Sequence, residues 1–366
     1  MSSNNVYGAL ASLGSAFSLA LGFMIWDVVW KKSHGSAFSL NLVKCNTASF
    51  GFLILGLSLG FVNNDEWKYS DIGYLILSGF IGIIVGDLCW LEALSRLGAV
   101  PVLVIDTIKP FSAALFGWLF FKEPIQKIAY AGLFLTASGI LIVGIDHERS
   151  FKKKVEKDMK VIVALDDGVN ANISLEENEE QDHLATINEE SEDIDRNDQQ
   201  KEDQNVSSRG YGYGLAVTNV LLDTYGSVLT KQHGSSFKNP AINLIRFGSS
   251  GVVMVLIVLI MKYIRMKAED QYPWFYLPHL TLISWLKIMS GILFVTFICP
   301  SLSNYALFRV PLYLALSLGS TTPLFAFLLE LISRRKPRFI GFVGAILSVG
   351  GVIVLATFGF TESTSD

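Results

Sequence analysis

Asp87 is the first side chain whose position asks for a chemical explanation. It stands within Val85-Gly86-Asp87-Leu88-Cys89-Trp90, an apolar run in which no base lies three or four residues away. A carboxyl group in apolar surroundings either finds a partner on another element or takes up a proton. The position favours proton exchange by Asp87, and a structural ion pair with Lys44 or Lys109 is the alternative.

Two further acid–base pairs occur at helical spacing in the same part of the chain. Asp106 and Lys109 are three residues apart, just before Pro110, and Glu92 and Arg96 are four residues apart. Both spacings let the two side chains pair on one helix face. Pro110 should interrupt its helix, and interrupted helices line many transport sites. Asp106, Lys109 and Glu92 are therefore candidates for a substrate or proton site, with structural pairing as the alternative.

Two cations, Lys44 and Arg246, are the last residues of closely similar motifs, Asn-Leu-Val-Lys at 41–44 and Asn-Leu-Ile-Arg at 243–246. Lys44 and Arg246 could anchor an anionic substrate, or they could extend to a membrane interface from their positions near helix starts. Asn219 and Asp223, four residues apart, are weaker candidates for the same site.

Motifs for enzymatic or metal chemistry are missing from the sequence. The three cysteines, Cys45, Cys89 and Cys299, lie in apolar runs without metal-ligand spacing and should pack as small apolar side chains. The chain has no H-E-x-x-H, no G-x-S-x-G and no phosphate-binding glycine loop. We expect no catalytic residue, no cofactor and no metal site.

The composition identifies the elements that must position these residues. Of 366 residues, 51% are hydrophobic and 17% are charged, whereas about 25% are charged in soluble domains. A membrane-spanning helix needs about 20 mainly apolar residues. Ten stretches qualify, and they predict an all-α polytopic membrane protein: 7–30, 39–61, 72–95, 97–121, 126–145, 211–230, 241–262, 281–303, 310–333 and 338–360.

One acidic segment divides these stretches into five and five. Residues 146–209 contain 19 acidic and 9 basic residues, a net charge of −10, against −4 for the whole chain. A segment with this composition cannot bury enough apolar surface to offset the loss of chain entropy on folding. We therefore expect a largely disordered linker. Its basic start, 149–160, lies beside a predicted membrane helix and favours anionic lipid over nucleic acid.

The two five-helix parts, 7–145 and 210–360, repeat each other. Lys32-Ser33-His34-Gly35 returns as Lys231-Gln232-His233-Gly234, a shift of 199, and from Ala93 onwards a shift of 213 holds without gaps. At that shift Pro110 meets Pro323 and Pro124 meets Pro337. Because five is an odd number, the second repeat enters the membrane from the opposite side. Inverted repeats are typical of secondary transporters.

The sequence resembles the EamA-type domain of the drug/metabolite transporter superfamily. The resemblance rests on Leu91-Glu92-Ala93-Leu94-Ser95-Arg96, Ile108-Lys109-Pro110-Phe111, Phe121-Lys122-Glu123-Pro124 and Ser138-Gly139-Ile140-Leu141-Ile142, and on Thr322-Pro323-Leu324-Phe325 and Gly341 to Val352 in the second half. It implies a ten-helix transporter with a central cavity and names no substrate, because the superfamily carries many metabolites. One departure is Lys336, which stands where the first repeat has Glu123.

The charges flanking the predicted helices bear on orientation. Lys and Arg favour the cytoplasmic side, and they follow the first, third, fifth, seventh and ninth stretches. This distribution places the acidic segment in the cytosol and both termini outside. The family resemblance implies the opposite, with both termini cytosolic.

These observations predict an integral, multi-pass membrane transporter of a small metabolite that works by alternating access, with proton coupling as a candidate property. We expect the substrate and the lipid bilayer as its partners and no nucleic acid. The alternative is a non-transporting sensor or scaffold whose acidic segment recruits another protein.

Overall fold

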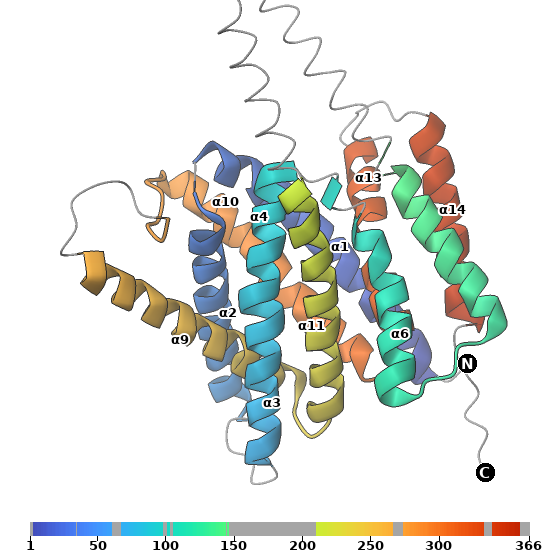
Figure 1. The fold of residues 1–366 in the computed structure, drawn as a ribbon, viewed down its shortest axis with the longest axis horizontal. Coiled ribbons are helices and arrows are strands. Elements are labelled where there is room, and N and C mark those ends of the chain that lie inside the picture. Colours follow the sequence, from blue (N-terminus) through green and yellow to red (C-terminus); the bar gives the residue numbers. More distant parts are fainter. Residues whose placement is uncertain are drawn as a thin grey trace, which may run out of the picture.

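The computed structural model describes residues 3–33, 35–60, 67–97, 101–102, 105–143, 145, 210–265, 274–332 and 339–358. The predicted linker, 146–209, lies outside the described residues. The described part of the chain is helical and contains no β-strand. Figure 1 shows the helices side by side as one bundle.

The first half begins with two long helices, α1 (Ser3–Lys32) and α2 (Ala37–Leu59). The next span consists of α3 (Tyr69–Gly79), a π-helical segment η1 (Phe80–Gly86) and α4 (Asp87–Leu97), which follow one another directly. A short 3₁₀ turn, η2 (Asp106–Ile108), leads into α6 (Lys109–Phe121). The half ends with the helix Lys127–Val143.

The second half repeats this order. It begins with a helix over residues 210–233 and continues with α9 (Asn239–Arg265). The next span consists of α10 (Leu282–Ile292), a second π-helical segment η3 (Leu293–Ile298) and α11 (Cys299–Leu307). The remaining helices are α12 (Leu312–Gly319), α13 (Thr322–Ile332) and α14 (Phe339–Phe358).

These segments coincide with the ten predicted apolar stretches, so the predicted fold class is confirmed. Six helical spans among the described residues are long and apolar enough to cross a membrane, and two shorter apolar helices accompany them. Large apolar side chains stand on the outside of the bundle, for example Phe50, Leu57 and Leu282, which are 66%, 67% and 76% exposed. In water such a surface would be unfavourable, and lipid tails would cover it.

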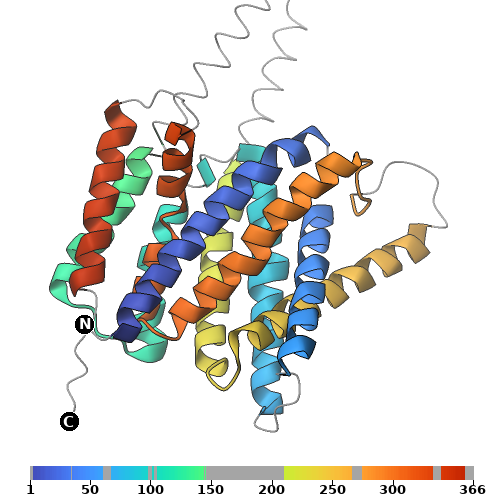
Figure 2. The same cartoon turned by 180° about the vertical axis from the view of Figure 1, so that it is seen from behind.

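The two halves run in opposite directions. In Figure 1, α1 begins at the lower end of the bundle, beside the N label, and its repeat equivalent 210–233 begins at the upper end. Figure 2 shows the same relation from behind. The end of α14 lies at the lower end of the bundle, whereas the helix Lys127–Val143 ends at the upper end (Figure 1). The inversion predicted from the odd number of helices is thus visible in the arrangement.

The two π-helical segments are a feature that the sequence did not suggest. Phe80 at the start of η1 and Leu293 at the start of η3 are separated by 213 residues, the shift of the sequence repeat. A π-helix shifts the backbone hydrogen bonds of its span and is frequent at functional sites. Both halves therefore carry the same irregularity at the same point of their third span.

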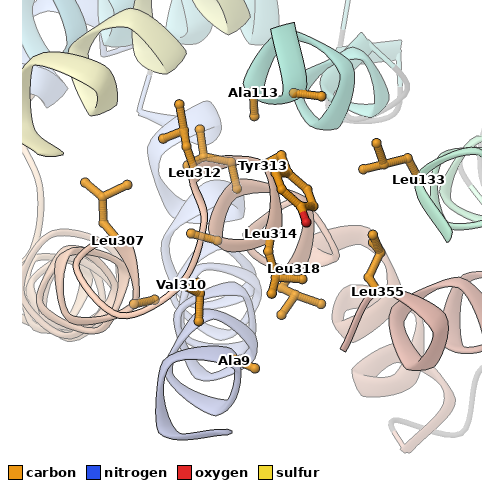
Figure 3. Packing of buried hydrophobic residues seen from close by; sticks show 14 of the residues in the cluster. Ala9, Ala113, Leu133, Leu307, Val310, Leu312, Tyr313, Leu314, Leu318 and Leu355 are labelled. Atoms are coloured by element: carbon orange, nitrogen blue, oxygen red, sulfur yellow. The ribbon is translucent and has the colours of Figure 1, made fainter. Parts of the chain in front are cut away.

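The largest apolar core surrounds α12, near the contact between the halves. All residues of Leu312–Leu318 are buried, and Ala9 from α1, Ala113 from α6 and Leu355 from α14 belong to the same cluster. Figure 3 shows these side chains converging on Tyr313 and its neighbours. A helix that is apolar on every side is expected at the centre of a membrane protein.

Close packing at the edge of the bundle depends on small residues. A Cβ atom added to Gly139, in the helix Lys127–Val143, would lie 2.3 Å from the backbone nitrogen of Ser348 in α14. A Cβ on Gly351 would lie 2.4 Å from the nitrogen of Thr136. These two helices, which lie side by side in Figure 1, touch through their backbones, as is common where membrane helices meet.

Candidate functional site

Lys44 and Asp87 form an ion pair between α2 and α4. Lys44 Nζ donates a hydrogen bond of 2.9 Å to Asp87 Oδ2. The Lys44 residue is only 3% exposed, so it points into the protein and does not extend to an interface. The ion pair with Lys44 that the sequence offered as the alternative for Asp87 is therefore present.

Lys109 and Asp223 form a second ion pair, and this one joins the two halves. Lys109 begins α6 in the first half, and Asp223 lies in the helix 210–233 of the second half. The sequence predicted Asp106 as the partner of Lys109. In the structure Asp106 is a second, half-buried carboxylate whose charge acts on Lys109 and on Asp223.

Arg246 is the third cation in this region. It lies in α9, is 9% exposed, and its Nε atom has no hydrogen-bond partner. The charges of Asp223 and Asp87 act on its guanidinium group. Among the described residues, no ion pair or side-chain hydrogen bond of this guanidinium is found.

These six residues form what we call the central charge cluster: Lys44, Asp87, Asp106, Lys109, Asp223 and Arg246. Its three carboxylates and three cations come from six elements and from both halves of the chain. Some of its side chains are accessible, since Asp87, Lys109 and Asp223 are 29%, 25% and 34% exposed. A solute that reached them could be bound by charge, and their carboxylates could exchange protons.

The π-helical segment η1 is held in place by two asparagines. Asn41 Nδ2 donates to the carbonyl of Ile83 at 2.8 Å, and Asn219 Nδ2 donates to the carbonyl of Gly86 at 2.9 Å. Asn219, a candidate from the sequence, therefore fixes the backbone next to Asp87. It connects the second half to the first without bearing a charge.

Glu92 lies outside the cluster. Its carboxylate pairs with Arg96 at 2.7 Å, and the two side chains are 40% and 35% exposed. The i,i+4 pair predicted as the structural alternative is present, so Glu92 is not brought together with the other candidates.

Cys299 is a neighbour of the cluster that the sequence interpretation missed. The charges of Lys109, Asp223 and Lys44 act on its thiol, and Ser15 Oγ lies 3.6 Å from its sulfur. The repeat contained a signal for it, because Cys299 aligns with Gly86 at the shift of 213 and so precedes the equivalent of Asp87.

A separate polar cluster lies where helix 210–233 ends. Lys231 Nζ donates to Glu123 Oε1 at 2.7 Å and to the carbonyl of Val310 at 3.0 Å. The other carboxylate oxygen of Glu123 accepts the backbone N–H of Leu312 at 2.7 Å. Glu123 follows α6 in the first half, so this contact also joins the halves.

His233 makes a second contact between the halves at the same helix end. Its Nδ1 atom lies 2.9 Å from Asp71 Oδ1, and its ring stacks on Tyr74 with centroids 3.8 Å apart. Its repeat equivalent, His34, lies outside the described residues. We call the contacts of Lys231 and His233 together the end latch.

Within the described ranges, no three His, Cys, Asp or Glu side chains gather in a group able to hold a metal ion.

Comparison with known proteins agrees with this architecture. The EamA-like transporter family matches residues 6–145 and 210–357. A solved structure titled "Crystal structure of protein" aligns over 100% of this chain and 99% of its own, with a TM-score of 0.62 and 13% identity. At that identity the likeness concerns the fold alone. A search of curated proteins gave no match.

Proposed function

The chain belongs to the EamA-like transporter family, and we propose that it carries a small metabolite through the membrane by alternating access between its two inverted halves. The observation that carries the proposal is the central charge cluster, which both halves contribute to. A site built in this way can open to either side when the halves rock against each other.

The ion pair of Lys109 and Asp223 supports this location of the site. A charge at the bilayer centre costs at least about 2.5–3.5 kcal/mol on insertion scales. Replacing both residues by apolar ones would remove that cost, and pairs of buried charges add little net stability compared with apolar packing. Retaining six ionisable groups at one place is therefore better explained by binding than by folding.

The end latch suggests how access is controlled in the arrangement seen here. Glu123 and Asp71 of the first half hold Lys231 and His233 of the second. The repeat does not provide the same contact at the other end, because the equivalents of Glu123 and Lys231 are Lys336 and Lys32, two cations. We propose that the latch closes one end and that the two ends open with unequal ease.

We further propose that transport is coupled to protons and that Asp87 is the residue that exchanges them. Lys44 Nζ lies 2.9 Å from Asp87 Oδ2. A proton on Asp87 would weaken that pair and leave Lys44 able to attract an anion. Proton binding and anion binding would then favour each other.

The division of the chain follows from the same proposal. We assign residues 7–145 and 210–360 to the two transport repeats and 146–209 to a linker. The two matched segments of the family support these boundaries. The helix Lys127–Val143 ends, and the helix 210–233 begins, at the upper end of the bundle in Figure 1, whereas the end latch lies at the other end of the helix 210–233.

An uptake screen tests the proposal. The purified full-length chain in lipid vesicles, with an imposed pH gradient, should accumulate at least one metabolite from a panel of organic acids, sugars, amino acids and phosphate esters. A variant that lacks residues 161–205 should keep this flux. If the full chain moves nothing and the deletion abolishes its cellular effect, the sensor or scaffold alternative is the better description.

A further inference from the structure

Within the proposed transport site, we propose that Arg246 is the residue that binds the acid group of the substrate, and that the substrate is therefore a small organic anion. The acid group of such an anion is a carboxylate or a phosphate, and both groups accept paired hydrogen bonds from a guanidinium. That the bound anion is a transported substrate rests on the proposed function. Anion binding by Arg246 does not depend on transport.

The other two cations of the central charge cluster are already occupied. Lys44 is paired with Asp87, and Lys109 is paired with Asp223. An anion that approached either lysine would have to displace a carboxylate. Arg246 has no such partner among the described residues, and its Nε atom is buried without a hydrogen bond.

The sequence repeat explains why Arg246 lacks a partner. Lys44 and Arg246 are equivalent residues, and Asp87, the partner of Lys44, is equivalent to Pro300. Proline has no charge and no side-chain acceptor. The first repeat thus contains a complete ion pair, whereas the second repeat contains its cation alone.

A buried guanidinium without a partner is unfavourable unless something supplies the missing acceptors. Burying an unpaired charge without hydrogen-bond acceptors is strongly unfavourable. Asp223 and Asp87 reduce this cost through their charges, but both carboxylates are bound to lysines. A bound anion would satisfy the donors directly.

Glycines of two elements lie close to the Arg246 guanidinium. Arg246 Nη2 lies 3.5 Å from the place that a Cβ atom on Gly82 would occupy, and that same place is 3.9 Å from the Cα atom of Gly226. The Nη2 end of the guanidinium therefore lies beside Gly82 of η1, at a point where η1 also approaches Gly226 of the helix 210–233. Arginine can offer two parallel N–H donors to the two oxygens of a carboxylate or phosphate, which lysine cannot do.

Anion binding to the purified protein can be measured without any transport. We would follow the melting temperature of the full chain in detergent while titrating inorganic phosphate or succinate, with sodium chloride at equal ionic strength as the reference. We expect at least one of the two anions to raise the melting temperature with saturation, and chloride to have no such effect. The two titrations distinguish a phosphate site from a carboxylate site.

Three variants decide whether Arg246 is responsible. Arg246→Gln should remove the saturable shift, and Arg246→Lys should weaken apparent binding by about tenfold because the two parallel donors are lost. Pro300→Asp keeps the arginine but gives it the carboxylate that the first repeat has, and it should also weaken binding. The matched control, Arg309→Gln, removes another partly buried arginine of the second half and should bind like the parent.

The outcomes separate this inference from the proposed function. Saturable binding that survives unchanged in both Arg246→Gln and Pro300→Asp overturns the inference, and so does a parent chain that responds to neither anion. Uptake of only neutral or cationic metabolites, unaffected by Arg246→Gln, would also overturn it and leave transport intact. Arg246-dependent anion binding without any uptake would support the inference and contradict transport.

Discussion

Asp223 of the second half forms an ion pair with Lys109 of the first half. In the sequence, the two residues are separated by the helix Lys127–Val143 and the acidic segment 146–209. When the halves move relative to one another, the pair must stretch or exchange partners, and Asp106 is a carboxylate already close enough to act on Lys109. The pair is therefore placed to respond to both substrate binding and the change in access.

Removing one member of this pair should harm both stability and uptake. Asp223→Asn leaves Lys109 without its ion-pair partner, and the expected loss lies between about 1 kcal/mol for an exposed pair and about 3–5 kcal/mol for a fully buried one. The intermediate exposure of the two side chains, 25% and 34%, sets this range. Thermal unfolding in detergent would measure it. The double exchange Lys109→Asp with Asp223→Lys should recover part of the loss, and no recovery would argue against a direct pair.

Asp87→Asn should remove the pH dependence of uptake. The amide cannot take up a proton, so Lys44 would be unpaired at every pH. We expect uptake driven by a pH gradient to fall to the rate without a gradient. Glu92→Gln is the matched control, since Glu92 is a carboxylate of the same span that pairs with Arg96 outside the cluster. Full pH-dependent uptake after both Asp87 and Asp106 are neutralised would reject the coupling proposal.

Glu123→Gln should open the end latch. Weakening the Lys231 contact by about 1.4 kcal/mol would raise the population of the open state roughly tenfold. The thiol of Cys299 beside the central cluster reports this opening in a chain whose other cysteines, Cys45 and Cys89, are alanine. We expect a water-soluble maleimide to label Cys299 several-fold faster.

Lys122→Gln is the control for the latch experiment, because it changes the charge of the neighbouring residue, which is exposed. It should label Cys299 at the parent rate. Equal rates in Glu123→Gln and in the parent would show that Glu123 does not limit access.

Gly139→Ala should destabilise the contact between the helix Lys127–Val143 and α14. The added methyl group would meet the backbone of Ser348, and overpacking of this kind costs about 1–3 kcal/mol. Gly214→Ala, where a Cβ atom meets nothing within 4 Å, should instead leave the melting temperature unchanged or raise it slightly. A melting temperature for Gly139→Ala equal to that of the parent would mean that the helices pack less closely than described.

The sequence predicts the helices, the repeat and the inversion because each is encoded locally. Apolar length marks the spans, and the prolines at 110, 124, 323 and 337 mark the repeat. The partner of Lys109 could not be predicted in this way. The three-residue spacing favours Asp106 as the partner, whereas Asp223 reaches Lys109 only through the packing of the two halves.

Other features of the site depend on the same long-range packing. Glu123 stood out only as part of a family pattern, and its contacts with Lys231 and Leu312 join residues 108 and 189 positions apart. The π-helical segments η1 and η3 have ordinary apolar sequences, and no residue in them predicts a π-helix. The alignment of Asp87 with Pro300, by contrast, follows from the fixed shift of 213 between the repeats and can be seen in the sequence alone.

Uptake kinetics across the central charge cluster test the account most directly. With a substrate found by the vesicle screen, we would compare the parent, Asp223→Asn and the control Glu92→Gln at equal amounts of reconstituted protein. We expect Asp223→Asn to lower the initial rate by at least about tenfold, a change of about 1.4 kcal/mol, and Glu92→Gln to keep the parent rate. Equal initial rates in all three proteins would contradict the claim that the substrate passes through this cluster.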